Sequence, residues 1–189
     1  GLKFHAIYTG YLGSEEQIEL VERLMDDFPT QDNLTFVDPV MADHGKLYAG
    51  FAPSFPDKMQ ALCRRADIIS PNITEACLLT HTPYRERHDE AYILSLLRKL
   101  LQLGVKTAIL TGIRTDTEHM GVAAMDSDGS HSLYYTDFVP AVFHGTGDLF
   151  ASTCVGALTL GLPTKMAIAL AADYVVRTIH VTKNDPEAR

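Results

Sequence analysis

The sequence predicts an α/β fold in which a mainly parallel sheet carries helices on both faces. Short apolar runs, which have the length of buried strands, alternate along the chain with longer segments of helical spacing. Strands and helices in series favour parallel strands joined by helices that cover the sheet. The 189 residues suit one domain, and no internal repeat, low-complexity tract or linker divides them. We therefore expect a single domain over residues 1–189.

The first half of the chain is expected to alternate strands with helices. A buried strand over residues 5–9 ends at Gly10, and a helix begins after Ser14. Ser14 and Gln17 form a Ser-x-x-Gln pattern, which is typical of a capping box. The next elements are a strand at 34–37, a helix at 54–65 with Phe55, Met59 and Leu62 as its inner face, a strand at 68–69, and a helix from about residue 74.

The second half is expected to add a helix, a strand, a hairpin and two final helices. Gly104 closes the first of these helices, a turn at 126–129 joins the hairpin, and Gly161-Leu-Pro163 separates the last two helices. The elements are a helix at 89–103, a strand at 105–110, paired strands at 120–125 and 132–135, and helices at 147–160 and 164–183.

Polar clusters follow three of the predicted strands. They are Asp38-Pro39, Ser70-Pro71-Asn72 and Thr111-Gly112. In open α/β sheets the ligand binds beyond the carboxyl ends of the strands. We therefore expect the three clusters to converge on one rim and to line a binding site there.

The segment Gly145-Thr-Gly-Asp148 places two glycines at the start of a predicted helix. Glycine lets the backbone approach a ligand closely, and the free N–H groups of a helix start bind anions. The carboxylate of Asp148, in the first turn, would take a proton from a hydroxyl while those N–H groups hold the developing negative charge. The alternative is a glycine-rich helix entry in which Asp148 is an N-terminal cap.

Acidic and amide side chains are grouped at two of the strand ends. Asp38 and Asp43 belong to one group, and Asn72 and Glu75 belong to the other. Hard oxygen ligands of this kind suit Mg²⁺ that carries a nucleotide phosphate. The alternative assigns structural roles, in which Asp38 begins a turn, Asn72 caps a helix and Glu75 favours the first turn of that helix.

Composition excludes several classes of partner. With 16 Lys and Arg against 24 Asp and Glu, the net charge of −8 disfavours nucleic acids and anionic membranes as partners. No run of about 18 apolar residues is present, so no membrane span is expected. The three cysteines form neither a CxxC motif nor a disulfide framework, which favours a reducing cytoplasm.

Histidines and the apolar residues of the last helix are not expected to bind a ligand. The eight histidines have no metal-binding spacing, and His81 and His88 flank a polar loop that should be solvated. Tyr174, Val175 and Ile179 lie at helical spacing and are expected in the core.

Three motifs together resemble the ribokinase superfamily, and within it the vitamin kinases. They are the GTGD helix start, VDPVMAD at 37–43 and SPNITEA at 70–76. The strand end Ile7-Tyr-Thr-Gly-Tyr-Leu-Gly13 is similar to that of the pyridoxal kinase family. Hydroxymethylpyrimidine kinases usually carry Cys where Asp148 stands, and sugar kinases usually carry Ala where Thr146 stands. Both differences indicate a kinase of pyridoxal, pyridoxine or pyridoxamine.

The resemblance implies a three-layer ribokinase-like fold and a role for each matching residue. Asp148 would be the general base that deprotonates the 5′-hydroxymethyl group of the vitamin, and Gly145, Thr146 and Gly147 would form the anion hole. The implied cofactors are ATP, Mg²⁺ and a monovalent cation, K⁺ or Na⁺. The further implied sites are Asp43 and Glu75 for Mg²⁺, in part through water; Asp38, Ser70 and Thr111 for the monovalent cation; Asn72, Thr111, Gly112, Val139, Pro140, Ala141 and Thr146 for ATP; and Tyr48 in a flexible loop over the active site.

The resemblance also implies a homodimer and a longer chain. Family members normally have a substantial segment before the strand expected near His5, and nothing here corresponds to it. We expect a chain truncated at the N-terminus, with the C-terminus as a second candidate, that exposes a sheet edge and apolar surface. Three other functions stay open: a hydroxymethylpyrimidine kinase, a sugar or nucleoside kinase, and a non-catalytic nucleotide-binding fragment.

Overall fold

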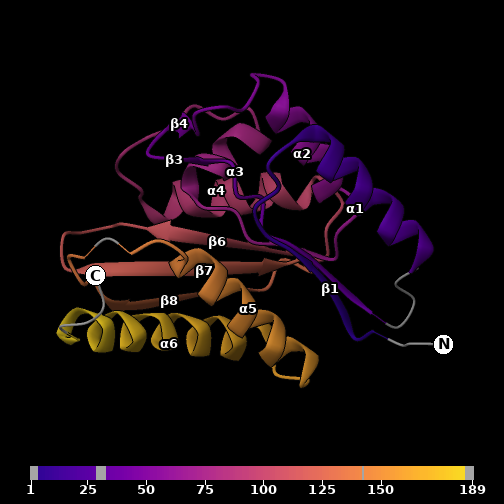
Figure 1. Ribbon diagram of the computed structural model, residues 1–189. Helices are drawn as coiled ribbons and strands as arrows, with labels where there is room; N and C mark the ends of the chain where they lie inside the picture. The colour runs from indigo at the N-terminus through magenta and orange to yellow at the C-terminus, as the bar shows by residue number, and fades with distance from the viewer. Residues whose placement is uncertain (1–3, 29–32, 142, 186–189) are drawn as a thin grey trace.

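A computed structural model describes residues 4–28, 33–141 and 143–185. Its centre is a six-stranded sheet with helices on both faces, as the sequence predicts (Figure 1). The strands follow the order β1-β2-β5-β6-β7-β8 across the sheet. Their bounds are Ala6–Thr9 (β1), Leu34–Val37 (β2), Ile68–Ile69 (β5), Thr107–Ile113 (β6), His119–Asp126 (β7) and His131–Asp137 (β8).

The sheet is mainly parallel, with an antiparallel hairpin at one side. β1, β2, β5 and β6 pair in parallel, whereas β7 runs antiparallel to both β6 and β8. Parallel neighbours need crossover connections, and helices supply them here. The carboxyl ends of the four parallel strands therefore lie along one rim. Both the parallel sheet and the hairpin are confirmed.

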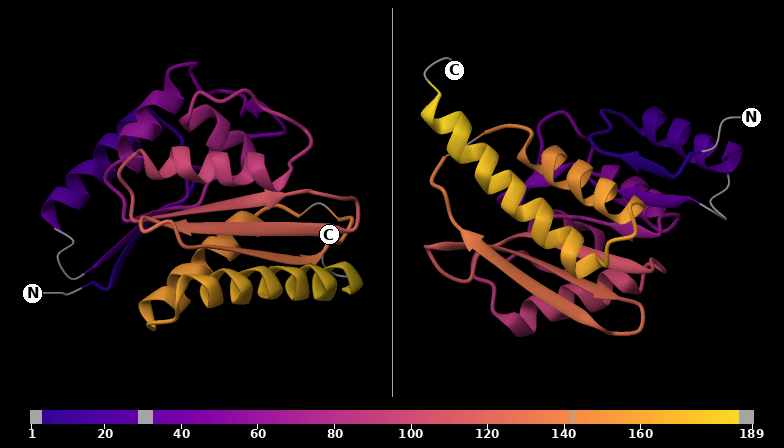
Figure 2. Two further views of the ribbon diagram at one scale, coloured as in Figure 1. Left: turned by 180° about the vertical axis from the view of Figure 1, so that it is seen from behind. Right: turned by 90° about the horizontal axis from the view of Figure 1, so that it is seen from below.

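Helices cover the sheet in two layers, which Figures 1 and 2 show from three sides. One layer holds four helices and the other holds two. Alternation along β2 sends Phe36 into the apolar core under the pair and Val37 into the core under the other four. The four are α1 (Glu15–Asp27), α2 (Phe55–Cys63), α3 (Ile73–Leu79) and α4 (Glu90–Leu101), and the pair is α5 (Thr146–Thr159) and α6 (Thr164–Asn184).

The start of α1 differs in one detail from the predicted capping box. Ser14 Oγ accepts a hydrogen bond from the Gln17 N–H at 3.4 Å, as expected. The Gln17 side chain, however, accepts from the N–H of Gly13 at 2.7 Å, one residue before the cap. Both hydrogen bonds stabilise the same helix start. The predicted inner face of α2 is confirmed, since its three apolar residues are buried.

β6 extends beyond the Thr111-Gly112 end that the sequence predicts. The strand continues to Ile113, because its pairing with β7 resumes after a shift of register between Leu110 and Ile113. Gly112 has a φ of +70°, which glycine adopts without strain. Thr111 meanwhile forms an isolated parallel bridge with Asn72. The irregularity thus places Thr111 against the rim rather than in a regular ladder.

Two features of the fold are absent from the sequence-based prediction. A short hairpin joins β3 (Ala42–Asp43) to β4 (Lys46–Leu47). His88, expected in solvent, is buried: its Nε2–H donates to the Arg85 carbonyl at 2.8 Å, and its Nδ1 accepts from the Arg114 N–H at 3.4 Å. The ring therefore joins the end of β6 to the loop before α4, which periodicity does not reveal.

Among the described residues, no helix has the length and apolar character needed to span a bilayer.

Candidate active site

The polar clusters that follow the strands converge on one rim of the sheet, as predicted. The N–H of Asp38 donates to the carbonyl of Thr9 at 2.8 Å, and the N–H of Ser70 donates to the carbonyl of Val37 at 3.0 Å. Thr111 continues the series through its bridge to the end of the 70–72 cluster. Because each cluster hydrogen-bonds the strand beside it, the sheet itself fixes their spacing.

Three backbone N–H groups hold the carboxylate of Glu75, which is buried. Oε1 accepts from Met41 at 3.1 Å and from Ala42 at 3.4 Å, and Oε2 accepts from Asn72 at 2.9 Å. In return Asn72 Oδ1 accepts from the Glu75 N–H at 2.9 Å, which completes a capping box at the start of α3. Asn72 Nδ2 also donates to the Ala42 carbonyl at 2.8 Å. The structural roles foreseen for Asn72 and Glu75 are therefore present.

Burial makes Asp38 and Glu75 difficult to ionise. Asp38 is 6 % exposed, and burial followed by the charge of Asp148 raises its pKa to about 7, although the Ser70 side chain opposes the shift. Burial followed by the charge of Asp38 raises the pKa of Glu75 to about 8, against its three N–H donors. A cation at this rim would favour the ionised form of both acids.

α5 begins without a side-chain cap from the described residues, so the capping alternative for Asp148 is wrong. Gly145 precedes the helix with a φ of +85°, which favours glycine. The Leu149 N–H donates to the Gly145 carbonyl at 3.0 Å, and the N–H groups of the intervening residues point out of the helix end. With the positive end of the helix dipole, they form a binding position for an anion. A Cβ built on Gly147 would meet no atom within 4 Å, so the space there is open.

Asp148 lies in the first turn of α5 and faces the end of β1. A Cβ built on Gly10, just after β1, would lie 3.3 Å from Oδ1 of Asp148. The same carboxylate is near enough to raise the pKa of Asp38. Asp148 nevertheless remains exposed. The structure therefore brings an accessible carboxylate, an uncapped helix start and two buried acids to one rim.

The β3–β4 hairpin and the segment after it lie over the same acids. Asp43 is exposed, and its Oδ1 accepts from the His44 N–H at 2.7 Å while its Oδ2 lies 3.5 Å from His44 Nε2. Tyr48 is 39 % exposed, and its pKa is raised by partial burial and then by the charge of Glu75, with smaller effects from Asp43 and Asp38. Tyr48 therefore lies within electrostatic reach of all three acids.

No group of three or more His, Cys, Asp or Glu side chains among the described residues is placed to enclose a metal ion. Asp38 and Glu75 interact with each other electrostatically, whereas Asp43 is turned toward His44. A cation held by these residues would need further ligands, from hydroxyls of the rim, water or a bound phosphate.

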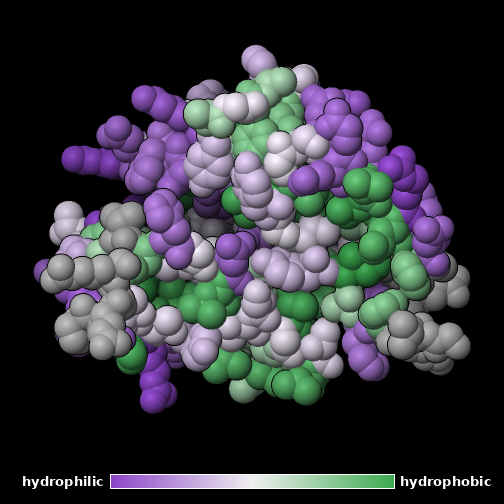
Figure 3. Space-filling model, in the orientation of Figure 1, coloured by the Kyte–Doolittle hydropathy of each residue, from purple (hydrophilic) through white to green (hydrophobic). Residues whose placement is uncertain are grey.

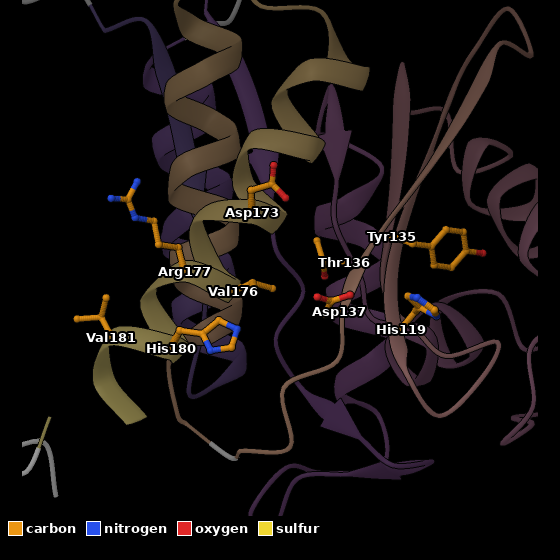
Figure 4. A pocket seen from close by; sticks show the side chains of 9 residues that line it. All are labelled: His119, Tyr135, Thr136, Asp137, Asp173, Val176, Arg177, His180 and Val181. Carbon is orange, nitrogen blue, oxygen red and sulfur yellow. The ribbon is translucent and has the colours of Figure 1, made fainter. Parts of the chain in front are cut away.

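Two hollows flank α6. The smaller, of about 150 Å³, lies between α6 and residues at the start of α5, and its lining includes His144, Gly145 and Thr146. The larger, of about 760 Å³, lies between α6 and β8, as Figure 4 shows. Its lining includes acidic, basic and neutral side chains, and it contains none of the predicted site residues. The smaller hollow is therefore the one that adjoins the candidate site.

One part of the smaller hollow is missed by the sequence-based prediction. Val175 and Ile179, expected in the core, line it together with Thr178 and Thr182. Val175 also packs against the apolar core under α5 and α6, as expected, whereas Tyr174 is 49 % exposed. Helical spacing shows that such residues share a face, and only the position of α5 decides what that face meets. The predicted 139–141 segment precedes the hollow along the chain and does not line it.

The comparisons with known proteins agree with this geometry. The family model described as phosphomethylpyrimidine kinase matches residues 1–187. The chain belongs to the phosphomethylpyrimidine kinase family. The sequence resemblance to the vitamin kinases, including the pyridoxal kinases, is thereby confirmed.

Individual relatives have names from both branches of the family. The chain is 29 % identical to the hydroxymethylpyrimidine/phosphomethylpyrimidine kinase of Haemophilus influenzae, covering 90 % of this chain and 63 % of the relative. It is 30 % identical to the pyridoxine/pyridoxal/pyridoxamine kinase of Bordetella avium, covering 94 % and 60 %. The chain thus spans about three fifths of the length of these two relatives.

A solved structure shares the fold closely. It is a proposed phosphomethylpyrimidine kinase from Bacteroides thetaiotaomicron, crystallised with pyridoxal. The TM-score is 0.91 at 32 % identity, and the match covers 99 % of this chain and 66 % of that one. The ribokinase-like fold class is therefore confirmed.

Proposed function

We propose that the chain carries out ATP-dependent phosphorylation of the 5′-hydroxymethyl group of pyridoxal, pyridoxine or pyridoxamine. The observation that supports this most is the position of Asp148. Its carboxylate is exposed, lies in the first turn of an uncapped helix, and faces the strand ends where two other acids are buried. Phosphoryl transfer requires mainly positioning and charge stabilisation, and this arrangement offers both.

In the proposed reaction Asp148 takes the proton of the vitamin hydroxymethyl group as the oxygen of that group attacks the γ-phosphorus of ATP. The bond from the γ-phosphorus to the β–γ bridging oxygen breaks, and ADP leaves with that electron pair. The N–H groups at the start of α5, from Thr146 to Asp148, stabilise the charge on the transferred phosphoryl group. Gly145, with its positive φ, sets the direction of these groups. The acidic protein repels ATP overall, so this local attraction and the accompanying cations must overcome the repulsion.

The cation sites remain part of the proposal. Mg²⁺ would be organised by Glu75 and Asp43, in part through water, and would neutralise charge on the phosphates. A monovalent cation would be held by Asp38, Ser70 and Thr111. The supporting observation is that Asp38 and Glu75 are both buried at the rim within electrostatic reach of each other, where a bound cation would stabilise their ionised forms.

The nucleotide is proposed to lie between the strand ends and α6. Asn72, Thr111 and Gly112 would contact its phosphates or line its path at the rim, and residues 139–141 would border its base. The small hollow beside Thr146 supports this position. Its α6 side offers apolar and hydroxyl side chains, which suit the face of a purine. Tyr48 would close over the acceptor.

The choice of a vitamin B6 compound as acceptor is supported by Asp148 and Thr146, which differ from the residues usual in the hydroxymethylpyrimidine and sugar kinases. The pyridoxal in the crystals of the Bacteroides thetaiotaomicron protein points the same way. The second candidate acceptor is hydroxymethylpyrimidine, which the family name and the Haemophilus influenzae relative favour.

A homodimer in the cytoplasm completes the proposal, and the three free, buried cysteines suit a reducing compartment.

The decisive experiment measures ATP turnover of the full 189-residue chain with pyridoxal, pyridoxamine, hydroxymethylpyrimidine and ribose in parallel. Faster turnover with the two B6 compounds supports the proposal, and faster turnover with hydroxymethylpyrimidine supports the second candidate. If ATP binds but no acceptor is phosphorylated, the chain is a nucleotide-binding fragment rather than a kinase.

A further inference from the structure

Tyr8 lies at the rim within the 7–13 motif, and the proposed function gives it no role. It is the third residue of β1, half-buried, and it faces the layer formed by α5 and α6. Its ring meets Phe36 edge to face, with 5.9 Å between the centroids and 77° between the planes. Phe36 is fully buried on the neighbouring strand. The sheet therefore fixes the ring of Tyr8, and only the hydroxyl end reaches the rim.

The hydroxyl of Tyr8 and the carboxylate of Asp148 border the same small space. A Cβ built on Gly10 would lie 3.3 Å from Tyr8 Oη and 3.3 Å from Asp148 Oδ1. The two oxygens are thus separated by no more than twice that distance. Glycine at position 10 leaves this space free, because any side chain there would press on both groups.

A hydroxyl on α5 lies near both residues. Ser152, one turn after Asp148, donates from Oγ to the Asp148 carbonyl at 2.6 Å. The same Ser152 hydroxyl lowers the pKa of the Tyr8 phenol, against the effect of burial. Ser152 is therefore a neighbour of both Tyr8 on the sheet and the backbone of Asp148 in the first turn of the helix.

The charges around Tyr8 keep its hydroxyl protonated. Burial raises its pKa to about 12, and the charges of Asp38 and Asp148 contribute in that order. A neutral phenol between two carboxylates can donate a hydrogen bond, whereas a phenolate would repel both.

We propose that Tyr8 is a positioning residue that holds Asp148, through Ser152, where the acceptor hydroxyl is deprotonated. The proposal rests on the function proposed above for Asp148. It assigns to Tyr8 no contact with ATP and no transfer of a proton to or from the substrate. Its physical basis is that a general base must be held within hydrogen-bonding distance of the proton it takes, and small displacements cost rate.

Tyr8→Phe is the direct test, because it removes the hydroxyl and keeps the ring against Phe36. We expect kcat to fall about tenfold with the KM for ATP unchanged. Tyr134→Phe is the matched control, since it removes a tyrosine hydroxyl that donates to Asp173 at 2.8 Å from β8, away from the rim. We expect Tyr134→Phe to leave both constants unchanged. An unchanged kcat in Tyr8→Phe would overturn the proposal.

A double-mutant cycle separates positioning from general stabilisation. In an Asp148→Asn background, Tyr8→Phe should not reduce the residual turnover further, because Tyr8 acts only through Asp148. A further tenfold loss in that background would mean that Tyr8 acts by another route, and the proposal would be rejected.

Urea unfolding tests the link between Tyr8 and Ser152 without measuring turnover, so its result does not depend on the proposed function. Tyr8→Phe and Ser152→Ala, singly and together, are compared by urea unfolding of the full chain. If the two hydroxyls interact, each single variant already loses that interaction. The unfolding equilibrium constant of the double variant should then be about threefold to tenfold smaller than the product of the two single effects predicts. Independent effects would remove the connection on which the proposal depends. A wild-type chain that phosphorylates no acceptor refutes the proposed function, while this cycle still decides whether Tyr8 and Ser152 are coupled.

Discussion

Asp148 gains its proposed role from its surroundings rather than from its type. Asp57 also lies in the first turn of a helix, α2, and is exposed. Neither helix start has a side-chain cap from the described residues, but Asp148 also has open space before it at Gly147 and the buried Asp38 within electrostatic reach. The comparison shows why an aspartate at a helix start is a weak signal alone and a strong one with its neighbours.

The first prediction concerns Asp148→Asn. Turnover should fall by ~10²–10⁴-fold, which is the usual contribution of a positioned base, while ATP binding is retained. Steady-state kinetics and calorimetric titration with ATP would measure the two effects. Asp57→Asn is the control and should change neither. Equal losses of turnover and ATP binding in Asp148→Asn would contradict the role of general base.

The second prediction concerns pH and the buried Asp38. Its pKa rises from 3.8 in the unfolded chain to about 7 in the folded protein, so between these values the folded state binds more protons. Stability from this group is therefore fully present below pH 3.8 and is lost as pH rises through 7. In cation-free buffer the free energy of unfolding should decline over this window, by a few kcal/mol at most for a shift of roughly three pKa units.

Asp38→Asn isolates the effect, because it keeps the shape and removes the charge. Urea unfolding at a series of pH values should show a flatter decline in this variant than in the wild type. Adding Mg²⁺ or K⁺ should flatten the wild-type curve as well, since a bound cation stabilises the ionised acid. Parallel curves for the two proteins would show that Asp38 does not carry the dependence.

At the scale of elements, α3 connects the rim to the hairpin above it. The helix has only seven residues, so its start contributes a large part of its stability. Asn72 both caps it and donates to Ala42, the first residue of β3. The conformation of residues 41–48 therefore depends on Asn72, the residue that caps α3.

The third prediction is that Asn72→Ala destabilises the chain by about 1–2 kcal/mol and raises the KM for ATP. The cap and the hydrogen bond to β3 are both lost, and the Glu75 N–H is left without its acceptor. Ser14→Ala is the control, because Ser14 caps α1 through an exposed 3.4 Å hydrogen bond to Gln17, outside the 41–48 segment. Its cost should be about 0.5–1 kcal/mol with no change in KM. An equal rise in the KM for ATP in Ser14→Ala and Asn72→Ala would contradict a specific role of Asn72 at the rim.

At the scale of the whole molecule, the surface near β1 is unusually apolar. β1 lies at one edge of the sheet. Leu20, Leu24 and Phe28 follow one face of α1 and are 40–57 % exposed, and Phe28 meets the exposed Phe4 edge to face. In Figure 3 hydrophobic residues reach the surface along the side where α1 lies. Exposed strand edges with apolar surroundings favour association with another chain.

The fourth prediction is therefore that the chain self-associates in solution. Sedimentation velocity over a range of protein concentrations should show a species larger than the monomer. The double substitution Leu20→Glu and Leu24→Glu should shift the distribution toward the monomer by adding charge to this face. Leu160→Glu is the control, because Leu160 is 83 % exposed at the turn after α5. A monomer at all concentrations would contradict the prediction.

A structural feature could be predicted from the sequence when the residues that determine it are close together in the chain. Strand and helix limits follow from neighbouring residues, so β2 and β5 are predicted with the bounds that the structure gives. The extension of β6 past Thr111 depends on pairing with β7, and the burial of His88 depends on Arg114 from another element. Local patterns contain no information about these distant partners.

The sequence by itself determined the order of strands and helices, the convergence of polar residues at the strand ends and the glycine-rich start of α5, because periodicity, capping and chain direction are local properties. The tertiary structure decided which groups meet there. It brought Tyr8 of β1 close to Asp148 of α5, and it raised the pKa values of Asp38 and Glu75 by burying them within electrostatic reach of each other. These outcomes depend on distances between segments far apart in the chain, which only the packing of the sheet and its two helical layers sets.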